Sequence, residues 1–570
     1  MQWVQRSVGL AIIGTASLGA LLLWLAVAAG DPEAGEAPEE GVVLGVWQVF
    51  YDTAAPPPRV LLAAVGVALL LAAGVALFER RIATHARRSD DPGRMPLAPK
   101  VVMAETRGVY AGPVTITVLI PARNEEGCIA ETLASLRAQS HPPERIIVVA
   151  DNCTDRTVPL AREAGVEVLE TVANTKKKAG GLNQALARVL PGMGDNDCVM
   201  VMDADTTLDA GFLAGAVRRL SDDRALMAVG GLFYGGEGAG LIGQFQRNEY
   251  TRYQRDLKRR RGRVFVLTGT ASVFRARALK AVAEERGRNL PGIPGDVYDT
   301  VALTEDNELT IALKSLGALM ISPAECTVVT EVMPTWRALW AQRLRWQRGA
   351  LENLGAYGLR PSTFRYWAQQ LGIGYGVIAL GSYLTLIILM LIATDTWVWF
   401  PFWIGVGLVF TVERVVTVWR GGWRARLLGL SLFPELFYAT FLNVVYVKGV
   451  WDLSWTGRPP GSMWCSPGTA RGRRTADDRV GDHPSGEHAA RGVHRRAVRI
   501  RRDQHHRLPH PGGGQDPAQG LRPRLVRHPQ PARRDAQHRP RRPDLSAAPR
   551  SVSAGPATMR PGSETHVTGL

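Results

Sequence analysis

The sequence predicts an α/β domain with a mostly parallel sheet, placed between transmembrane helices and followed by a disordered tail. Short β-rich runs alternate with helical patterns through residues 113–335, which is typical of such a sheet. Apolar runs long enough to cross roughly 30 Å of hydrocarbon precede and follow this region. Near residue 465 the composition changes abruptly, and Arg, Pro, Gly and His become frequent. The 570 residues therefore form more than one structural unit.

Residues 1–79 are predicted to form two transmembrane helices joined by an acidic external loop. The first apolar run, residues 8–30, is either an uncleaved anchor or a cleaved signal peptide. The second, residues 60–78, is followed closely by several arginines. Because cytosolic loops are rich in Arg and Lys, residues 80–360 are expected in the cytosol, with residues 80–112 as a linker.

The C-terminal membrane region, residues 372–455, is expected to cross the bilayer two or three times. Two clear apolar runs cover residues 372–393 and 398–419. A third, residues 428–450, is interrupted by Pro434 and a neighbouring glutamate, so it is either broken, re-entrant or lined by protein. The chain is therefore expected to be a multi-pass protein of the plasma membrane with its α/β domain in the cytoplasm.

Residues 465–570 carry most of the positive charge of the chain. They hold 21 Arg and 9 acidic residues, which accounts for +12 of the net charge of +16. They have no hydrophobic period, so they are predicted to be disordered, although a shifted reading frame would give the same composition. Aromatic residues for stacking on bases are scarce there, so no nucleic-acid partner is expected. The five scattered cysteines show no disulfide spacing.

Four strands and two helices can be placed in the first part of the α/β region. Each strand is a β-rich apolar run, and each helix shows a helical apolar period. The strands are predicted at residues 115–120, 145–150, 166–169 and 198–202, and the helices at residues 126–139 and 179–189.

Acidic residues follow three of these strands. Glu125 follows the first strand, Asp151 follows the second, and Asp203 and Asp205 follow the fourth. Ligands of such sheets bind at the carboxyl ends of the strands, where these loops meet. Two carboxylates one residue apart can share Mg²⁺ or Mn²⁺ with a diphosphate. A second Asp-x-Asp, at residues 195–197, precedes its strand in a Gly-rich turn and is interpreted as a solvated loop.

Three further motifs could be functional or merely structural. Lys178 begins the pattern Lys-Ala-Gly-Gly-Leu-Asn, which by itself is a solvated helix start. Gly269 and Thr270 lie in a turn where the missing side chain would let a ligand approach the backbone, or in a plain β-turn. Glu305 and Asp306 precede a predicted helix at residues 307–316, where acids also act as caps.

A helix predicted within residues 336–360 carries Gln342, Arg345 and Trp346 on one face. Positions i, i+3 and i+4 are neighbours on a helix surface. Together they offer an amide, a guanidinium that suits phosphate, and an aromatic platform. An interfacial membrane helix would also be rich in Trp and Arg, which explains the composition but not this order.

These residues together resemble the family 2 glycosyltransferases, and in particular the processive membrane polysaccharide synthases. That group includes poly-N-acetylglucosamine, chitin, hyaluronan and cellulose synthases, and the resemblance covers residues 60–464. It implies the GT-A fold for residues 113–335, a UDP-sugar donor, a glycan or lipid acceptor, and Mg²⁺ or Mn²⁺. It also implies an inverting reaction that extends a β-linked polysaccharide, with export through the membrane helices.

The resemblance further implies a role for each motif. Asp306 would be the general base, Asp203 and Asp205 would bind the metal, and the other residues would bind the two substrates. The donor would contact Asp151, Lys178, Asp203, Gln342 and Arg345, and the acceptor would contact Gly269, Thr270, Glu305 and Trp346.

Two alternatives remain open at this stage. The same chemistry could add one sugar to a lipid such as diacylglycerol or a polyprenyl phosphate. A degenerate domain could instead serve as a non-catalytic membrane scaffold, although every acidic position of the motifs is filled. Cellulose synthases have Cys where this chain has Thr268, and the Arg-Trp-Gln-Arg-Gly sequence at residues 345–349 is nearer the poly-N-acetylglucosamine type.

Overall fold

The structure is a computed structural model, and it covers the predicted α/β domain and most of the C-terminal membrane region. The first predicted span, residues 8–30, and the predicted disordered tail, residues 465–570, lie outside the described residues. The described residues are 39–51, 57–108, 112–259, 262, 264–393 and 401–456.

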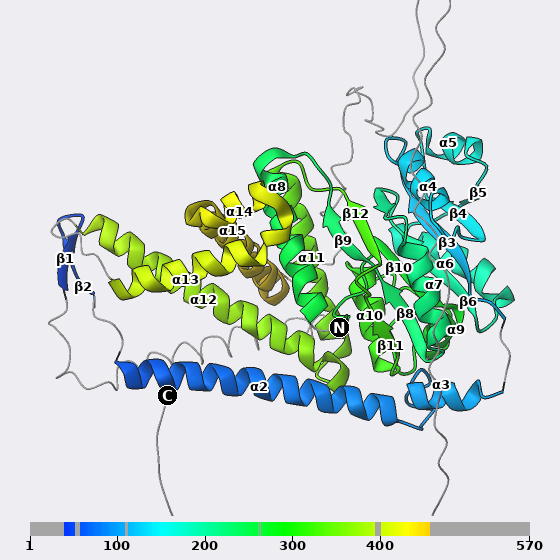
Figure 1. Cartoon of the computed structure of the whole chain (residues 1–570), viewed down its shortest axis with the longest axis horizontal. Helices are drawn as coiled ribbons and strands as arrows, with labels where there is room; N and C mark the ends of the chain where they lie inside the picture. Colours follow the sequence, from blue (N-terminus) through cyan, green and yellow to red (C-terminus); the bar gives the residue numbers. More distant parts are fainter. Residues whose placement is uncertain are drawn as a thin grey trace, which may run out of the picture. The chain divides into compact units, whose positions relative to one another are not determined.

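A mixed seven-stranded sheet forms the centre of the domain (Figure 1). The four strands placed from the sequence are parallel neighbours, and one antiparallel strand, β10, joins them to the other half of the sheet. The spatial order is β11-β8-β10-β6-β3-β4-β5. The bounds are β3 (Thr115–Ala122), β4 (Arg145–Ala150), β5 (Glu167–Glu170), β6 (Asp197–Met202), β8 (Leu226–Gly230), β10 (Ala271–Arg275) and β11 (Leu319–Ile321).

Helices cover both faces of this sheet. Alternate side chains of a strand point to opposite faces, so Leu119 of β3 belongs to one apolar cluster and Ile120 to the other. Burial on both faces explains why the strands are continuous apolar runs. One face carries α6 (Lys177–Val189), α9 (Ala276–Glu285) and α10 (Glu305–Ser315), and the other carries α4 (Ile129–Arg137) and α7 (Phe212–Asp222). The remaining short helices are α3 (Pro99–Glu105) and α5 (Thr157–Glu163).

A second sheet of three short strands was not predicted from the sequence. Its order is β7-β12-β9, and its strands are β7 (Thr206–Leu208), β9 (Leu232–Gly235) and β12 (Thr327–Thr330). Because β7 starts directly after Asp205, this sheet extends from the same edge at which β6 ends. A separate two-stranded hairpin comprises β1 (Glu39–Val43) and β2 (Trp47–Tyr51).

Two long helices, α8 (Gly240–Arg259) and α11 (Trp336–Tyr357), pack against the C-terminal helices. Phe245 of α8 and Leu339 of α11 share an apolar cluster with Leu428 and Tyr438. The last two belong to α14 (Gly422–Leu430) and α15 (Leu432–Trp451). The domain and these helices are therefore in direct contact.

Two of the described helices are long and apolar enough to cross a membrane. They are α2 (Pro58–Arg88), blue in Figure 1, and α12 (Phe364–Ile392). The helix α13 (Pro401–Thr417) covers the described part of the next predicted span. The apolar run at 428–450 is broken at Ser431, where α14 and α15 meet at a bend of 92°. Crossing of a bilayer remains a prediction for all of them.

The acid that interrupts this last run has a partner in the α/β domain. Glu435 lies in the first turn of α15 and is 5% exposed. Its Oε1 accepts hydrogen bonds from Arg252 Nη2 at 2.8 Å and from Asn248 Nδ2 at 3.4 Å, both on α8. Because a buried carboxylate requires such partners, Glu435 ties α15 to the domain.

Candidate active site

The loops after β4 and β5 fix the carboxylate of Asp151. Asp151 is 6% exposed, and its Oδ1 accepts hydrogen bonds from Thr171 Oγ1 at 2.8 Å and Asn174 Nδ2 at 2.9 Å. Asn152 Nδ2 also donates to Oδ1, at 2.9 Å. A buried carboxylate that is oriented by three donors is suited to receive an N–H group from a ligand.

Lys178 lies in the first turn of α6 and is paired rather than solvated. Its Nζ lies 2.5 Å from Asp203 Oδ1 and 3.3 Å from Glu305 Oε1. Burial would lower the pKa of Lys178, but the charges of Asp203 and Glu305 outweigh it, so the pKa is raised. The ammonium therefore stays protonated and joins α6, β6 and α10.

The Gly269 turn lies where these elements converge. Gly269 N donates to Asp306 Oδ2 at 3.2 Å. A Cβ at Gly269 would lie 3.3 Å from Lys178 Nζ, 3.6 Å from Asp306 Oδ2 and 3.7 Å from Asp203 Oδ2. Asp203 N donates to Thr270 O at 3.1 Å. The absence of a side chain at Gly269 keeps this space open between two carboxylates and an ammonium.

Asp306 has the properties of a general base. Burial and then the charge of Glu305 raise its pKa to about 6, although the charge of Lys178 opposes the shift. Its Oδ1 accepts a hydrogen bond from Asn307 N at 2.7 Å. A carboxylate whose pKa lies just below neutral pH is ionised and still accepts a proton. Helix capping by Thr304 is not observed, because its side chain makes no capping hydrogen bond.

Asp205 lies among other acids at the end of β6. Burial, together with the charges of Asp203, Glu125 and Glu331, raises its pKa to about 7. Glu331 was not found from the sequence. The pair Thr330↔Thr206 joins β12 to β7 in antiparallel register, which places Glu331 beside Asp205. The acid directly after the β-branched run at residues 327–330 was the available signal.

The donor set at Asp205 fits a hard divalent cation. The charged neighbours that shift its pKa are all acidic, so a cation would relieve their repulsion. Carboxylate oxygens are the ligands that Mg²⁺ and Mn²⁺ prefer. Among the described residues no group of three or more His, Cys, Asp or Glu forms a complete metal site.

The helix α11 is held against the start of α10. Asn353 Nδ2 lies 3.3 Å from both O and Oγ1 of Thr304, the residue before Glu305. The pKa of Glu305 is lowered because Lys178, a backbone hydrogen bond and Arg345 together outweigh the effect of burial. The predicted motif on α11 and the predicted acid on α10 are thus adjacent.

A glycine makes this contact possible. A Cβ at Gly349 would overlap Thr304 Oγ1. Gly349→Ala is expected to push α11 away from α10 and to destabilise the protein by about 1–3 kcal/mol, with a parallel loss of activity. Thermal melting and activity assays check this. The matched control is Gly372→Ala in α12, where a Cβ meets nothing within 4 Å. A melting temperature that is equal for the two variants would contradict the contact.

The other two residues of the motif lie on the same helix. Gln342 is half-buried and its Oε1 accepts a hydrogen bond from Arg343 Nη1 at 2.8 Å. Trp346 is 36% exposed. The structure thus pairs Lys178 with Asp203 and Glu305. It places Arg345 on the exposed side of α11, the helix whose Asn353 contacts Thr304. Asp151 lies in its own hydrogen-bonded pocket, which is linked to α6 because Asn174 Nδ2 donates to Lys177 O at 2.8 Å.

A residue that the sequence left without a role, Asn183, shapes the floor of the site. Its Oδ1 accepts from Tyr298 N at 2.9 Å, and its Nδ2 donates to Tyr298 O at 2.9 Å. Tyr298 lines the cavity that also contains Lys178, Gly269 and Asp306. The Asn at the end of the Lys-x-x-x-Leu-Asn pattern therefore holds the loop at Tyr298 in place instead of binding a ligand.

The same loop is anchored by a fully buried ion pair. Arg286 Nη2 lies 2.7 Å from Glu308 Oε2, and the two side chains are 0% and 1% exposed. Arg286 Nη2 also donates to Val297 O at 2.6 Å, and Tyr357 OH to Glu308 Oε1 at 2.5 Å. Arg286→Met should cost about 3–5 kcal/mol, because it leaves a buried charge unpaired.

The double variant Arg286→Met/Glu308→Leu is the matched control for this pair. It removes both charges, so it is expected to lose less stability than either single variant. Chemical unfolding of the purified chain measures the difference. Equal losses in the single and double variants would show that the pair is not coupled.

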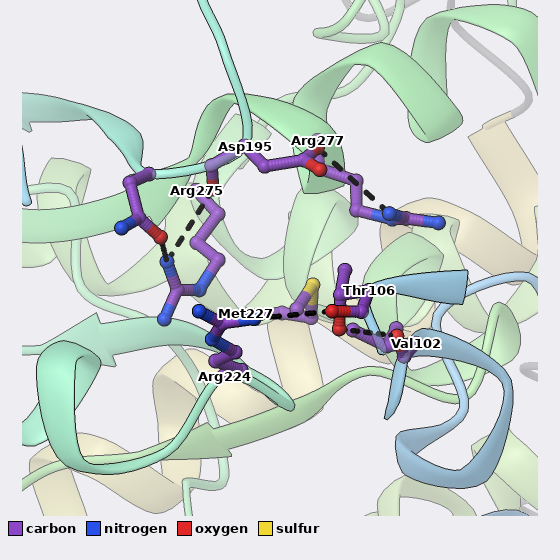
Figure 2. Close-up of a pocket in the computed structure, with 8 residues that line it drawn as sticks. Val102, Thr106, Asp195, Arg224, Met227, Arg275 and Arg277 are labelled. Carbon is purple, nitrogen blue, oxygen red and sulfur yellow. Dashed lines mark hydrogen bonds and ion pairs between the residues drawn. The ribbon is translucent and has the colours of Figure 1, made fainter. Parts of the chain in front are cut away.

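A second cavity lies at the opposite end of β6 and is not a candidate catalytic site (Figure 2). Arg275 is 2% exposed and donates to backbone oxygens, including Leu226 O at 2.7 Å. Arg277 lies 3.8 Å from Asp195, which belongs to the Asp-x-Asp before β6. The guanidiniums of Arg275 and Arg277 thus hold neighbouring loops together, which agrees with the structural interpretation of the Asp-x-Asp at residues 195–197.

The region just described is similar to known proteins. Residues 113–349 match the model of the family described as "Glycosyltransferase like family 2". A probable glycosyltransferase of Bacillus subtilis is 32% identical over 248 residues, which are 41% of this chain and 54% of that protein. A poly-β-1,6-N-acetyl-D-glucosamine synthase of Staphylococcus aureus is 27% identical over 247 residues, 42% of this chain and 55% of that protein. The chain thus spans about half the length of these relatives.

Among solved structures, a mannosyltransferase from Pyrobaculum calidifontis, in complex with GDP-mannose and Mn²⁺, aligns with a TM-score of 0.40 at 17% sequence identity. The alignment covers 69% of this chain and 98% of the other.

Proposed function

Because residues 113–349 form a glycosyltransferase family 2 domain, we propose that the chain transfers sugars from a UDP-sugar to a growing β-linked polysaccharide at the plasma membrane. The mixed sheet with helices on both faces is the GT-A fold of such enzymes. The similarity to a poly-β-1,6-N-acetyl-D-glucosamine synthase supports a polysaccharide product.

The convergence at Gly269 carries this proposal. The Asp306 carboxylate, the Lys178 ammonium and Asp203 meet around a turn that has no side chain. Asp306 takes the proton from an acceptor hydroxyl while that oxygen attacks C1 of the donor sugar. The bond between C1 and the diphosphate oxygen breaks, and UDP leaves with the electron pair. A single displacement of this kind inverts the configuration at C1 and forms no covalent enzyme intermediate.

The donor has a complementary residue for each of its parts. The oriented carboxylate of Asp151 accepts a hydrogen bond from N3–H of uracil. The exposed guanidinium of Arg345 pairs with the diphosphate. Lys178 keeps its positive charge beside Asp203. Gln342 offers its amide to the donor from the same face of α11.

The acidic residues at the end of β6 would hold Mg²⁺ or Mn²⁺. Asp205 and Asp203 would supply carboxylate oxygens to it. When bound, the cation neutralises charge on the departing UDP.

The acceptor end of the glycan would lie between Trp346 and the Gly269 turn. The exposed part of the Trp346 ring offers a flat surface for a sugar ring. Thr270 and Glu305 add polar groups for its hydroxyls, and the acceptor hydroxyl reaches Asp306. From there the glycan would leave towards the helices that are predicted to cross the bilayer.

The test is an assay of product size with the purified full-length chain. Radiolabelled UDP-N-acetylglucosamine, UDP-glucose and UDP-glucuronate are supplied in turn with Mg²⁺ or Mn²⁺. The expected product is a polymer that elutes in the void volume of a sizing column. A chloroform-soluble lipid with one sugar would instead identify the lipid acceptor, and no transfer from any donor would support a scaffold.

A further inference from the structure

Arg343 of α11 contacts two residues of the proposed substrate-binding face from inside the protein. Its Nη1 donates to Gln342 Oε1 at 2.8 Å, and its guanidinium carbon lies 4.4 Å from the centroid of the Trp346 ring. Arg343 is 5% exposed, whereas Trp346 is 36% exposed. The guanidinium therefore covers one face of the indole at the buried side.

Two other helices fix the position of Arg343. Its Nη2 lies 2.9 Å from Glu249 Oε2 on α8, and Tyr438 OH of α15 donates to the same oxygen at 2.5 Å. The ring of Tyr250, also on α8, lies 5.6 Å from the guanidinium carbon. Among the described residues the buried Nε of Arg343 has no hydrogen-bond partner, so the aromatic rings are part of its surroundings.

Resting on the proposed function, we propose that Arg343 is a positioning residue that orients Trp346 for the acceptor end of the glycan. A ring face covered at 4.4 Å cannot receive a sugar, so the acceptor stacks on the opposite face. Contact with the guanidinium also restricts rotation of the indole. Less conformational freedom is then lost when the sugar binds, which strengthens acceptor binding.

The effect should fall mainly on the acceptor, because the charge of Arg343 is already paired with Glu249 at 2.9 Å. The guanidinium of Arg345, in contrast, is exposed. On the donor side Arg343 contributes the hydrogen bond to Gln342 Oε1, whereas on the acceptor side it covers one face of Trp346. Its loss should therefore weaken acceptor binding more than donor binding. A residue needed only for folding would not separate the two substrates.

The test measures the KM of each substrate in the full-length chain. UDP-N-acetylglucosamine, or whichever UDP-sugar the wild type uses, is varied against an oligosaccharide of the same sugar, and then the reverse. Arg343→Met should raise the acceptor KM by about 10-fold, the loss of one cation–π contact, with a smaller rise in the donor KM from the lost hydrogen bond to Gln342. Arg343→Lys keeps the charge but not the flat stack, so an intermediate value is expected. Equal changes in both KM values, or an unchanged acceptor KM, would overturn the proposal.

Arg348→Met is the matched control, because Arg348 is also buried on α11 and pairs with Glu352 at 2.8 Å. It should lower the melting temperature and leave the acceptor KM unchanged; a raised acceptor KM there would count against a specific role of Arg343. If Arg343→Met does not fold, Tyr438→Phe loosens Glu249 and should still raise the acceptor KM, and no rise would overturn the proposal.

Different results would overturn the proposed function and the role of Arg343. A wild-type chain that transfers no sugar would overturn the proposed function and this inference together. Normal wild-type kinetics with an unchanged acceptor KM in Arg343→Met would overturn the inference alone.

Discussion

Asp306→Asn is expected to lower the rate of sugar transfer by about 10²–10⁴-fold, the usual contribution of a general base. Asparagine has nearly the same shape, and its amide oxygen can still accept the hydrogen bond from Gly269 N. Donor binding should therefore be retained. Calorimetry with UDP measures binding, and release of UDP in the presence of acceptor measures turnover.

The pH dependence of the wild type provides an independent check on Asp306. Burial raises the pKa of this carboxyl to about 6, and only the ionised form can accept the acceptor proton. Because protonation removes the base, kcat/KM should fall as the pH drops through about 6 and should level off above it. In Asp306→Asn this acidic limb should disappear.

The exposed Asp222 at the end of α7 offers a control with the same loss of charge. Asp222→Asn should retain both the wild-type rate and the acidic limb. If Asp306→Asn kept most of the wild-type turnover, another group would have to be the base, and the proposed mechanism would be wrong.

Asp205→Asn is expected to lower transfer by about 100-fold at a fixed Mn²⁺ concentration, because several kcal/mol of charge stabilisation are lost with a metal ligand. The variant should also bind Mn²⁺ more weakly in the presence of UDP, which electron paramagnetic resonance measures without any turnover. A part of the activity should return at high Mn²⁺.

Asp197→Asn is the matched control for Asp205, since Asp197 lies at the other end of β6 and accepts a hydrogen bond from Thr115 Oγ1 at 2.6 Å. It should leave Mn²⁺ binding unchanged, whatever its effect on stability. Wild-type Mn²⁺ binding in Asp205→Asn would show that the cation is held elsewhere.

Much of the candidate site could be predicted from the sequence because parallel strands end at one edge of a sheet. Asp151, Asp203 and Asp205 follow apolar runs, and that pattern alone places them at the same edge of the sheet. Lys178 and Asp306 could not be placed beside each other in this way. Their proximity around Gly269 depends on how α6 and α10 pack on the sheet, and the family resemblance alone assigned both residues to one site.

Other features depend on contacts that no local pattern reports. Glu331 reaches Asp205 only through the register of β7 with β12, two strands too short to show a period. In the sequence, Arg343 cannot be distinguished from any arginine at a membrane interface. Its position is defined only by tertiary contacts with Glu249 of α8, which Tyr438 of α15 also contacts. Likewise, the apolar run at 428–450 shows an interruption, but the break at Ser431 and its 92° bend are tertiary features.

The anomeric configuration of the transferred sugar tests the central claim most directly. A single displacement assisted by Asp306 must invert C1, so an α-linked UDP-sugar must give a β-linked product. Nuclear magnetic resonance of the purified product, supported by digestion with β-specific hydrolases, gives the configuration of each new linkage. We expect β linkages throughout, and α linkages would contradict the inverting mechanism.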